Sequence, residues 1–327
     1  MKQTALFVAL LVMVLLTSCT DSTQKSKVGK NTDSAPWELL VVANKEWTKT
    51  NDGSVFMQVM HKEIPGLNQV ESSFHVVNVN PNSFSKTFQG YANIVKADFG
   101  SKYAKASMSV AHDVYAHPQI IITLTAPNGR ELAQYASDNS DKIISLLTEA
   151  ELASVQIDLR KRYSSQVLSQ AQKQFGISIF APKEVKNITK IGDDFFWASE
   201  EDNENRMNIC MYTIDLTNSS PASLEAMRDS VMEINIRGYK DNQYMATVPG
   251  LTMIHSINVN GAVVTEARGL WEMKNDMMGG SYIMHVREDL IPGKLLVVEG
   301  FVYAPNKSKR LLIRQLEAAL RTVRLSD

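Results

Sequence analysis

Short apolar runs alternate with amphipathic stretches along the first half of the chain. Trp37–Ala43 and Phe74–Val79 are dense in aliphatic side chains and predict two buried strands. Asn51–Ile64 carries apolar side chains at spacings of one, three and four, which predicts a helix that begins near Asp52. In Ser83–Phe99 the apolar side chains of Phe84, Phe88, Tyr91 and Val95 step by four, three and four residues, and they predict a second helix.

The next segment changes from strand-like to helix-like. Ala106–Tyr115 and Gln119–Ala126 predict a hairpin whose strands meet near His117-Pro118. Glu131–Phe175 lacks glycine and proline and keeps an apolar 3/4 spacing, so it predicts a long helix with room for one break near Ser137–Ser140. Gly176 suits the end of that helix, and we expect a domain boundary there, between residues 36–176 and 177–327.

The second half has a different hydrophobic pattern, which predicts several strands and two helices. Asn260-Gly261 is a strong tight-turn signal between two of these strands. The pattern predicts an α+β fold of two α/β-layered halves with largely antiparallel sheets. The predicted strands are Ile177–Ala181, Phe195–Ser199, Met207–Leu216, Met253–Val259, Ala262–Met273, Ser281–Val286 and Leu295–Tyr303, and the predicted helices are Ser219–Glu233 and Ser308–Val323.

The N-terminus has the pattern of an export signal. A lysine follows Met1, and Ala5–Leu16 is an unbroken apolar run that is shorter than the roughly 20 residues of a membrane-spanning helix. The run ends in Leu16-Thr-Ser-Cys19, which resembles a bacterial lipobox. That resemblance implies that residues 1–18 are cut off and that Cys19 carries the lipid that anchors the chain to a membrane.

A polar tether is expected after Cys19. Residues 19–35 contain no aromatic side chain and too little apolar surface to order themselves. Asp33-Ser34-Ala35 resembles the short O-glycosylation motif of exported Bacteroidota proteins, so Ser34 is a candidate for modification. Surface-exposed lipoproteins of these bacteria carry acidic residues directly after the lipidated cysteine. Here only Asp21 lies among the first five, which favours the periplasmic face of the outer membrane over the cell surface.

Composition excludes several classes of function. The 34 basic and 35 acidic side chains give a net charge of −1, so no global basic field favours nucleic acid. The two cysteines cannot form a disulfide framework, and Cys210 lies in an apolar strand where a buried, unreactive thiol is expected.

No enzyme motif or cofactor-binding motif occurs in the sequence. His112 and His117 form the one close pair of histidines, and they are poorly phased for a shared ligand on a strand or a helix. A turn at Pro118 would bring them together, so a metal site there stays open as an alternative.

Several segments of the chain, most of them in the second half, are recognisable. Ala267–Ser281 and Glu299–Arg310 resemble two signature segments of a Bacteroidota lipoprotein family described only as a domain of unknown function. Three shorter segments also resemble that family: Lys183–Gly192, Arg228–Val231 and Asp113–Ala116. The resemblance extends from about Trp37 to the C-terminus and implies a cell-envelope lipoprotein of a bacterium with two membranes, with no catalytic residue to carry over. The element order of residues 177–325 also resembles the Mog1/PsbP-like α/β/α sandwich, whose exported members are mostly binding or assembly modules.

The segment Arg268–Tyr282 is the predicted binding surface. Its aromatic and methionine side chains offer adaptable apolar area, and its paired glycines permit close approach of a ligand. The alternative is a β-hairpin with a Gly-Gly turn whose aromatic side chains fill the core. We expect an envelope lipoprotein that binds a protein or another envelope component. The other hypothesis is an envelope hydrolase for peptidoglycan, lipid or glycan with a site between the two halves. The candidate binding residues are Arg268, Trp271, Glu272, Met277, Met278, Gly279, Gly280 and Tyr282.

Overall fold

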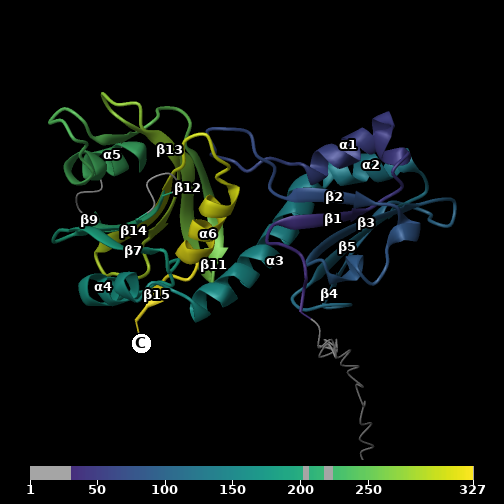
Figure 1. The fold of residues 1–327 in the computed structure, drawn as a ribbon, viewed down its shortest axis with the longest axis horizontal. Helices are drawn as coiled ribbons and strands as arrows, with labels where there is room; N and C mark the ends of the chain where they lie inside the picture. Colours follow the sequence, from purple (N-terminus) through teal and green to yellow (C-terminus); the bar gives the residue numbers. More distant parts are fainter. Residues whose placement is uncertain (1–30, 202–205, 217–223, 327) are drawn as a thin grey trace, which may run out of the picture.

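A five-stranded mixed sheet forms the centre of the first domain (Figure 1). The structure, a computed structural model, describes residues 31–201, 206–216 and 224–326. The strands lie in the order β2-β1-β3-β5-β4; all neighbours pair in parallel except β4, which is antiparallel to β5. Their bounds are β1 (Glu38–Val42), β2 (His75–Val79), β3 (Asn93–Phe99), β4 (Ser107–His112) and β5 (Ile120–Ala126).

The prediction of a largely antiparallel sheet is wrong for this half. The central strands β1, β3 and β5 are covered on both faces, and such strands carry continuous apolar runs rather than an alternating pattern. The predicted hairpin of β4 and β5 is present.

The helix predicted over Ser83–Phe99 is also wrong. The structure has two short 3₁₀ turns at Pro81–Ser83 and Phe88–Gly90, followed by strand β3 in the middle of the sheet. Phe84, Phe88 and Tyr91 pack against the sheet face that the helices leave open. Their spacing matched a helix by chance, because aromatic side chains in a loop that covers a core face can have any spacing.

Helices cover the other face of the sheet. They are α1 (Asn51–Met60), α2 (Gly129–Asp138) and α3 (Ser140–Lys161). The predicted break near Ser137–Ser140 is present, with the end of α2 at Asp138 and the start of α3 at Ser140. A second break was not predicted: residues 162–164 separate α3 from α4 (Ser165–Phe175), which ends at Gly176 with a left-handed φ of 67°.

Helix α4 packs with the second half of the chain, because Val167, Ala171 and Phe175 belong to its core. The structural division between the two cores therefore falls at residues 162–164, earlier than the boundary expected at residue 176.

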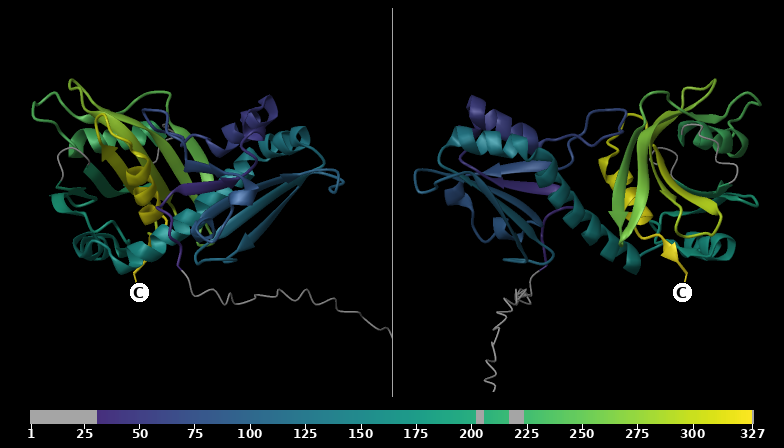
Figure 2. Two further views of the ribbon diagram at one scale, coloured as in Figure 1. Left: turned by 45° about the vertical axis from the view of Figure 1, so that its right-hand side comes forward. Right: turned by 180° about the vertical axis from the view of Figure 1, so that it is seen from behind.

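The second domain is an antiparallel half-barrel of eight strands with helices on both faces (Figure 2). Helix α5 (Leu224–Asn235) lies within the curve of the sheet, while α4 and α6 (Arg310–Leu320) cover the opposite face. Asn260 and Gly261 both have positive φ and form the tight turn that was predicted. The strands are β7 (Val185–Ile191), β8 (Phe195–Glu200), β9 (Arg206–Asp215), β10 (Met245–Thr247), β11 (Met253–Val259), β12 (Ala262–Met273), β13 (Gly279–Arg287) and β14 (Lys294–Tyr303), with a separate pair of β6 (Ile177–Ser178) and β15 (Arg324–Leu325).

The two domains share their cores. Ala318 and Ala319 of α6 belong to the apolar core of the first domain, whereas Leu316 and Leu320 of the same helix belong to the core of the second. Conversely, Ile64 reaches from the first domain into the core of the second. Helix α6 is therefore packed between the half-barrel and α3, and it fixes the two domains against each other (Figure 1).

A carboxylate of the first domain also caps α6. Glu71 accepts hydrogen bonds from the backbone N–H groups of Lys309 (2.7 Å) and Arg310 (3.0 Å) and from the Ser308 hydroxyl. Burial acts to raise the pKa of Glu71, but these hydrogen bonds outweigh it and the pKa lies below its usual value. A negative charge at the N-terminus of a helix is favourable, so this contact adds to the attachment of the two domains.

The described part of the N-terminal tether lies against the first domain. The backbone N–H of Thr32 donates to the carbonyl of His117 (3.3 Å), and that of Asp33 donates to Gly90 (2.9 Å). The tether was expected to stay without ordered structure as far as Ala35. Residues 31–35 lie against the first domain instead, so this part of the expectation is wrong. The signal sequence and Cys19 lie outside the described residues. None of the helices within the described ranges is long and apolar enough to cross a membrane.

Candidate functional site

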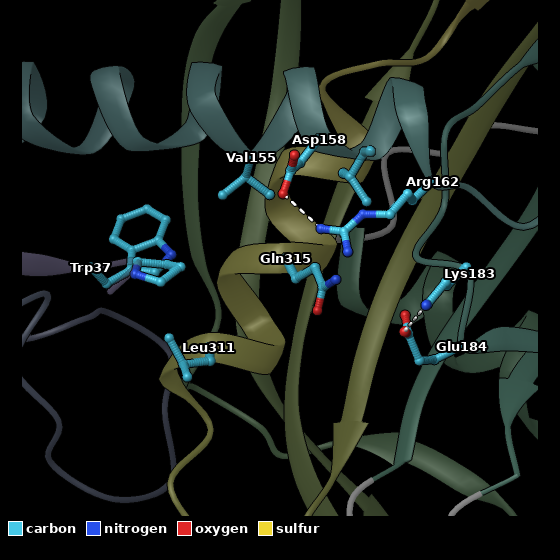
Figure 3. A pocket seen from close by; sticks show the side chains of 10 residues that line it. Trp37, Val155, Asp158, Arg162, Lys183, Glu184, Leu311 and Gln315 are labelled. Atoms are coloured by element: carbon cyan, nitrogen blue, oxygen red, sulfur yellow. Dashed lines mark hydrogen bonds and ion pairs between the residues drawn. The ribbon is translucent and has the colours of Figure 1, made fainter. Parts of the chain in front are cut away.

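A groove of about 340 Å³ lies between α3 and α6, where the two domains meet (Figure 3). Val155 and Leu159 of α3 form one wall, and Leu311 and Gln315 of α6 form the other. Leu311 keeps 53% of its surface exposed, although it is a large apolar side chain. The remaining lining residues are Pro36, Trp37, Asp158, Arg162, Lys183 and Glu184.

Trp37 forms one end of the groove and is held firmly. Its backbone has a φ of 64°, a left-handed conformation that is uncommon for a bulky residue. Its N–H donates to Glu151 Oε1 (3.1 Å), and the Arg314 guanidinium lies 4.8 Å from its ring centre. The side chain is only 2% exposed and packs in the core of the first domain, so Trp37 supports the end of the groove from beneath.

Ion pairs lie on the opposite end and rim of the groove. Asp158 of α3 and Arg162, directly after the end of this helix, pair at 2.9 Å, and Lys183 and Glu184 approach each other at 3.9 Å (Figure 3). All four side chains are exposed to solvent by more than a third of their surface, so they remain accessible to a ligand. The groove thus combines apolar walls with charges of both signs.

Arg268, a predicted binding residue, lies inside the protein. It bonds to Glu266 (2.8 Å) on its own strand and to Glu317 (2.6 Å) on α6, and its side chain is 6% exposed. His285 shares Glu266 (3.1 Å), and burial lowers the pKa of this histidine. The network holds the half-barrel against α6 and leaves Arg268 no access to a ligand.

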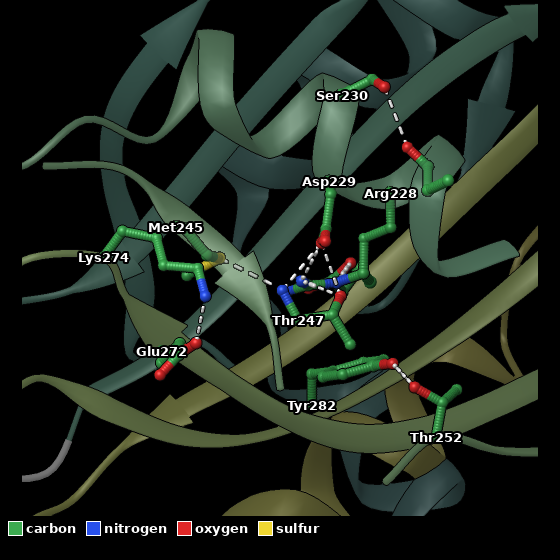
Figure 4. Close-up of polar contacts among 11 residues, drawn as sticks. Arg228, Asp229, Ser230, Met245, Thr247, Thr252, Glu272, Lys274 and Tyr282 are labelled. Carbon is green, nitrogen blue, oxygen red and sulfur yellow. Dashed lines mark hydrogen bonds and ion pairs between the residues drawn. The ribbon is translucent and has the colours of Figure 1, made fainter. Parts of the chain in front are cut away.

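Trp271 and Tyr282 are also buried. The Trp271 indole N–H donates to the Val302 carbonyl at 3.2 Å. The Arg228 guanidinium lies 4.2 Å from the centre of the Tyr282 ring, and the Tyr282 hydroxyl is 3.0 Å from that of Thr252 (Figure 4). Both aromatic side chains fill the core beneath α5, as the hairpin alternative expected.

The paired glycines do not form the turn of that hairpin. The turn falls within residues 274–278, and Gly279 and Gly280 begin β13 opposite Glu272 and Trp271. A Cβ atom on Gly280 would lie 2.0 Å from the Val302 carbonyl oxygen, so the close approach is to a neighbouring strand rather than to a ligand.

The other predicted surface residues are spread over the end of the hairpin. Glu272 pairs with Lys274 at 2.5 Å, as Figure 4 shows. Met278 is partly buried against the core, whereas Met277 is fully exposed in the turn. The structure therefore brings no continuous binding surface together from Arg268–Tyr282.

Cys210 lies in the protein interior, and Ser34 is hydrogen-bonded to the first domain. Cys210 is fully buried with a free thiol, so the expectation of a buried thiol is confirmed, and burial raises its pKa well above the usual value. The Ser34 hydroxyl accepts a hydrogen bond from the Ala92 N–H (3.0 Å), which restricts its access to a modifying enzyme.

The structure brings His112 and His117 to the same pocket, together with Asp113. His117 Nδ1 lies 2.9 Å from Asp113 Oδ2. Within residues 31–201, 206–216 and 224–326, no group of three or more His, Cys, Asp or Glu side chains is arranged to hold a metal ion.

Sequence reasoning missed the groove. The pattern places Trp37 at the start of a strand, and Leu312, next to Leu311, fits the apolar stripe of the last helix. The one signal in the sequence is that Leu311 adds a large apolar side chain outside that stripe.

Comparison with known proteins bears on the two domains separately. No curated protein matches the chain. Among similar solved structures is a crystal structure from Bacteroides thetaiotaomicron, with 9% sequence identity and a TM-score of 0.26 over 46% of this chain and 46% of that one. Residues 33–160 match the family model of a domain of unknown function (DUF8532), and residues 164–322 match that of another (DUF4837). The chain therefore joins two domains of unknown function, DUF8532 followed by DUF4837.

Proposed function

We propose that this chain is a lipid-anchored lipoprotein of the cell envelope that binds a partner protein without catalysing a reaction. The lipobox-like segment that ends at Cys19 supports the anchor. The groove between α3 and α6 supports the binding role. The periplasmic face of the outer membrane is the proposed location, because only one acidic residue follows Cys19 closely.

The groove is the observation that carries this proposal. Its occupant is a short polypeptide segment that inserts an apolar side chain between the partly buried Val155 of α3 and the exposed Leu311 of α6. Apolar walls suit such an anchor residue, and flanking charges of both signs suit the mixed charges of a peptide better than a polyanion. Because both domains line the groove and share their cores, its walls are fixed before a partner arrives, which reduces the entropy lost on binding.

A likeness to the Mog1/PsbP-like sandwich is part of the proposal. The half-barrel has α5 on one face and α4 and α6 on the other, which agrees with an α/β/α arrangement. Fold likeness alone does not determine activity, so it supports the binding role only together with the groove.

The alternative is an envelope hydrolase with a site between the two halves. Such a site requires close carboxylates or a histidine–carboxylate pair in the groove. The acidic residues that line the groove, Asp158 and Glu184, each lie beside a basic side chain, and no histidine lines it. The observations therefore favour binding.

Leu311→Arg is expected to abolish capture of the partner while leaving the fold intact. Leu311 is 53% exposed, so a charged side chain at this position disturbs the groove without entering the core. Ile254 on β11 has the same 53% exposure and does not line the groove, which makes Ile254→Arg the matched control. The measurement is crosslinking and affinity purification from native membranes, with mass spectrometry of the proteins recovered. Equal recovery of the same partner by both variants would refute the groove as the binding surface.

Cys19→Ala is expected to block processing and lipid attachment. The variant should keep its signal sequence and its larger mass, and an alkaline carbonate wash should release far more of it than of the wild-type protein. Intact-mass analysis and membrane fractionation provide the measurements. If the variant is processed normally and is held as firmly in the membrane fraction, the anchor at Cys19 is wrong. Protease treatment of intact cells tests the leaflet, because removal of the wild-type protein would place it on the cell surface.

A further inference from the structure

A second pocket, of about 250 Å³, lies in the first domain between α3 and the loop that joins β4 to β5. It does not overlap the groove between the domains. This volume holds about eight water molecules, enough for a small organic ligand. Much of the wall is apolar, from Ala150 and Ala153 on α3 and from Pro118 and Ile120 on the facing loop and strand.

Glu151 is a buried carboxylate that lines this pocket. It is 5% exposed, and its Oε1 accepts hydrogen bonds from the Asn93 side chain (2.6 Å) and from the Trp37 N–H (3.1 Å). Its Oε2 accepts no hydrogen bond from any residue that the structure describes. This oxygen is not one of the fully buried, unpaired polar atoms of the described residues, so it keeps contact with solvent and is open to a molecule in the pocket that Glu151 lines. Burial raises the pKa of Glu151 despite the hydrogen bonds from Asn93 and Trp37, as expected for a carboxylate without a counter-charge.

The facing loop contributes further hydrogen-bond acceptors. Asp113 is held with a φ of 52° and accepts from the Gln119 N–H (2.9 Å) and from His117 Nδ1 (2.9 Å). An ionised carboxylate only accepts, so His117 Nδ1 is the donor in this contact.

The charge of the pocket is negative. Asp113 and Glu151 are the acidic side chains among its lining residues, and that lining contains no lysine or arginine. A ligand that supplies a positive charge with several N–H donors therefore matches both the charge and the unused acceptor of Glu151.

We propose that this pocket binds a small organic cation, a primary ammonium group on a short apolar stem, with the ammonium against Glu151 and the stem between Ala153 and Pro118. A primary ammonium has three donors and no acceptor, which fits a site built from acceptors. The proposal is independent of the partner-binding role of the groove, since a different set of residues carries it.

The test is calorimetric titration of the full chain in a non-ionic detergent with n-butylammonium and with the neutral 1-butanol. We expect n-butylammonium to bind and 1-butanol to bind at least roughly tenfold more weakly, because the alcohol lacks the charge. Glu151→Gln is expected to weaken n-butylammonium binding by a similar factor. This substitution keeps a carbonyl oxygen for Asn93 and Trp37, so the fold should persist. Glu131→Gln, at an exposed carboxylate of α2, is the charge control and should leave the affinity unchanged.

A second variant tests the pocket without altering the buried carboxylate. Ala153 is exposed at the rim, and Ala153→Trp should block entry, whereas Ser145→Trp at another exposed position of α3 should have no effect. The proposal is overturned if n-butylammonium does not bind, if 1-butanol binds equally well, if Glu151→Gln stays within twofold of the wild type, or if Ala153→Trp still binds.

Discussion

Arg228→Met is expected to lower the free energy of unfolding by about 3–5 kcal/mol, because it leaves a buried carboxylate without its counter-charge. Arg228 Nε and Nη2 donate to Glu299 at distances down to 2.7 Å, and both side chains are 0% exposed. Burial raises the pKa of Glu299 even with Arg228 present. Denaturant unfolding at neutral pH, followed by circular dichroism, measures the change.

The reason for this loss can be tested with a second substitution. Arg228→Met/Glu299→Leu removes both charges, and it should recover most of the stability because an apolar pair of similar volume is tolerated in place of a buried ion pair. Arg160→Met, at an exposed arginine of α3, should change the stability by less than about 0.5 kcal/mol. A double variant as unstable as the sum of the two single variants would show that the unpaired charge is not the cause.

Glu317→Gln is expected to lower the free energy of unfolding by a similar amount, roughly 3–5 kcal/mol, and to destabilise both domains. Glu317 on α6 is 1% exposed and accepts from Arg268 (2.6 Å) and Arg314 (2.7 Å). Arg314 in turn donates to Ser73 of the first domain at 3.4 Å. Because α6 belongs to both cores, the variant should still unfold in a single transition at lower denaturant concentration.

The pH dependence of this variant follows from the pKa of Glu317. Burial acts to raise that pKa, but the attraction of Arg268 and Arg314 outweighs it and holds the pKa well below the usual 4.5. A carboxyl group with a lowered pKa stabilises the fold above its unfolded-state pKa, and this contribution is lost as the pH falls through and below that value. The gap in stability between the wild type and Glu317→Gln should therefore be constant above about pH 4.5 and narrow under more acidic conditions.

Glu149→Gln provides the matched control. Glu149 pairs with Arg321 of the same network, but its side chain is 55% exposed, so its removal should cost no more than about 1 kcal/mol. An equal loss of stability in Glu149→Gln and Glu317→Gln would contradict the role that we assign to burial.

The predicted binding surface shows that a local sequence pattern does not determine whether a segment binds a ligand or fills the core. Arg268, Trp271 and Tyr282 are polar or amphipathic side chains in a recognisable segment, and their sequence does not distinguish a binding surface from a core. Their burial depends on Arg228, Glu317 and Val302, which approach from segments far away in the chain. The groove and the Glu151 pocket depend in the same way on contacts between distant elements.

The sequence by itself determined the elements whose pattern is local. Six of the eight strands of the half-barrel follow from apolar content and alternation within a few residues, whereas β7 and β10 were not predicted. The Asn260-Gly261 turn, the end of α4 at Gly176 and the buried Cys210 also follow from local sequence. The tertiary structure alone decided the parallel pairing of β1, β3 and β5 and the sharing of α6 by two cores. The physical reason is that burial and charge pairing depend on which surfaces meet, and residues far apart in the chain supply those surfaces.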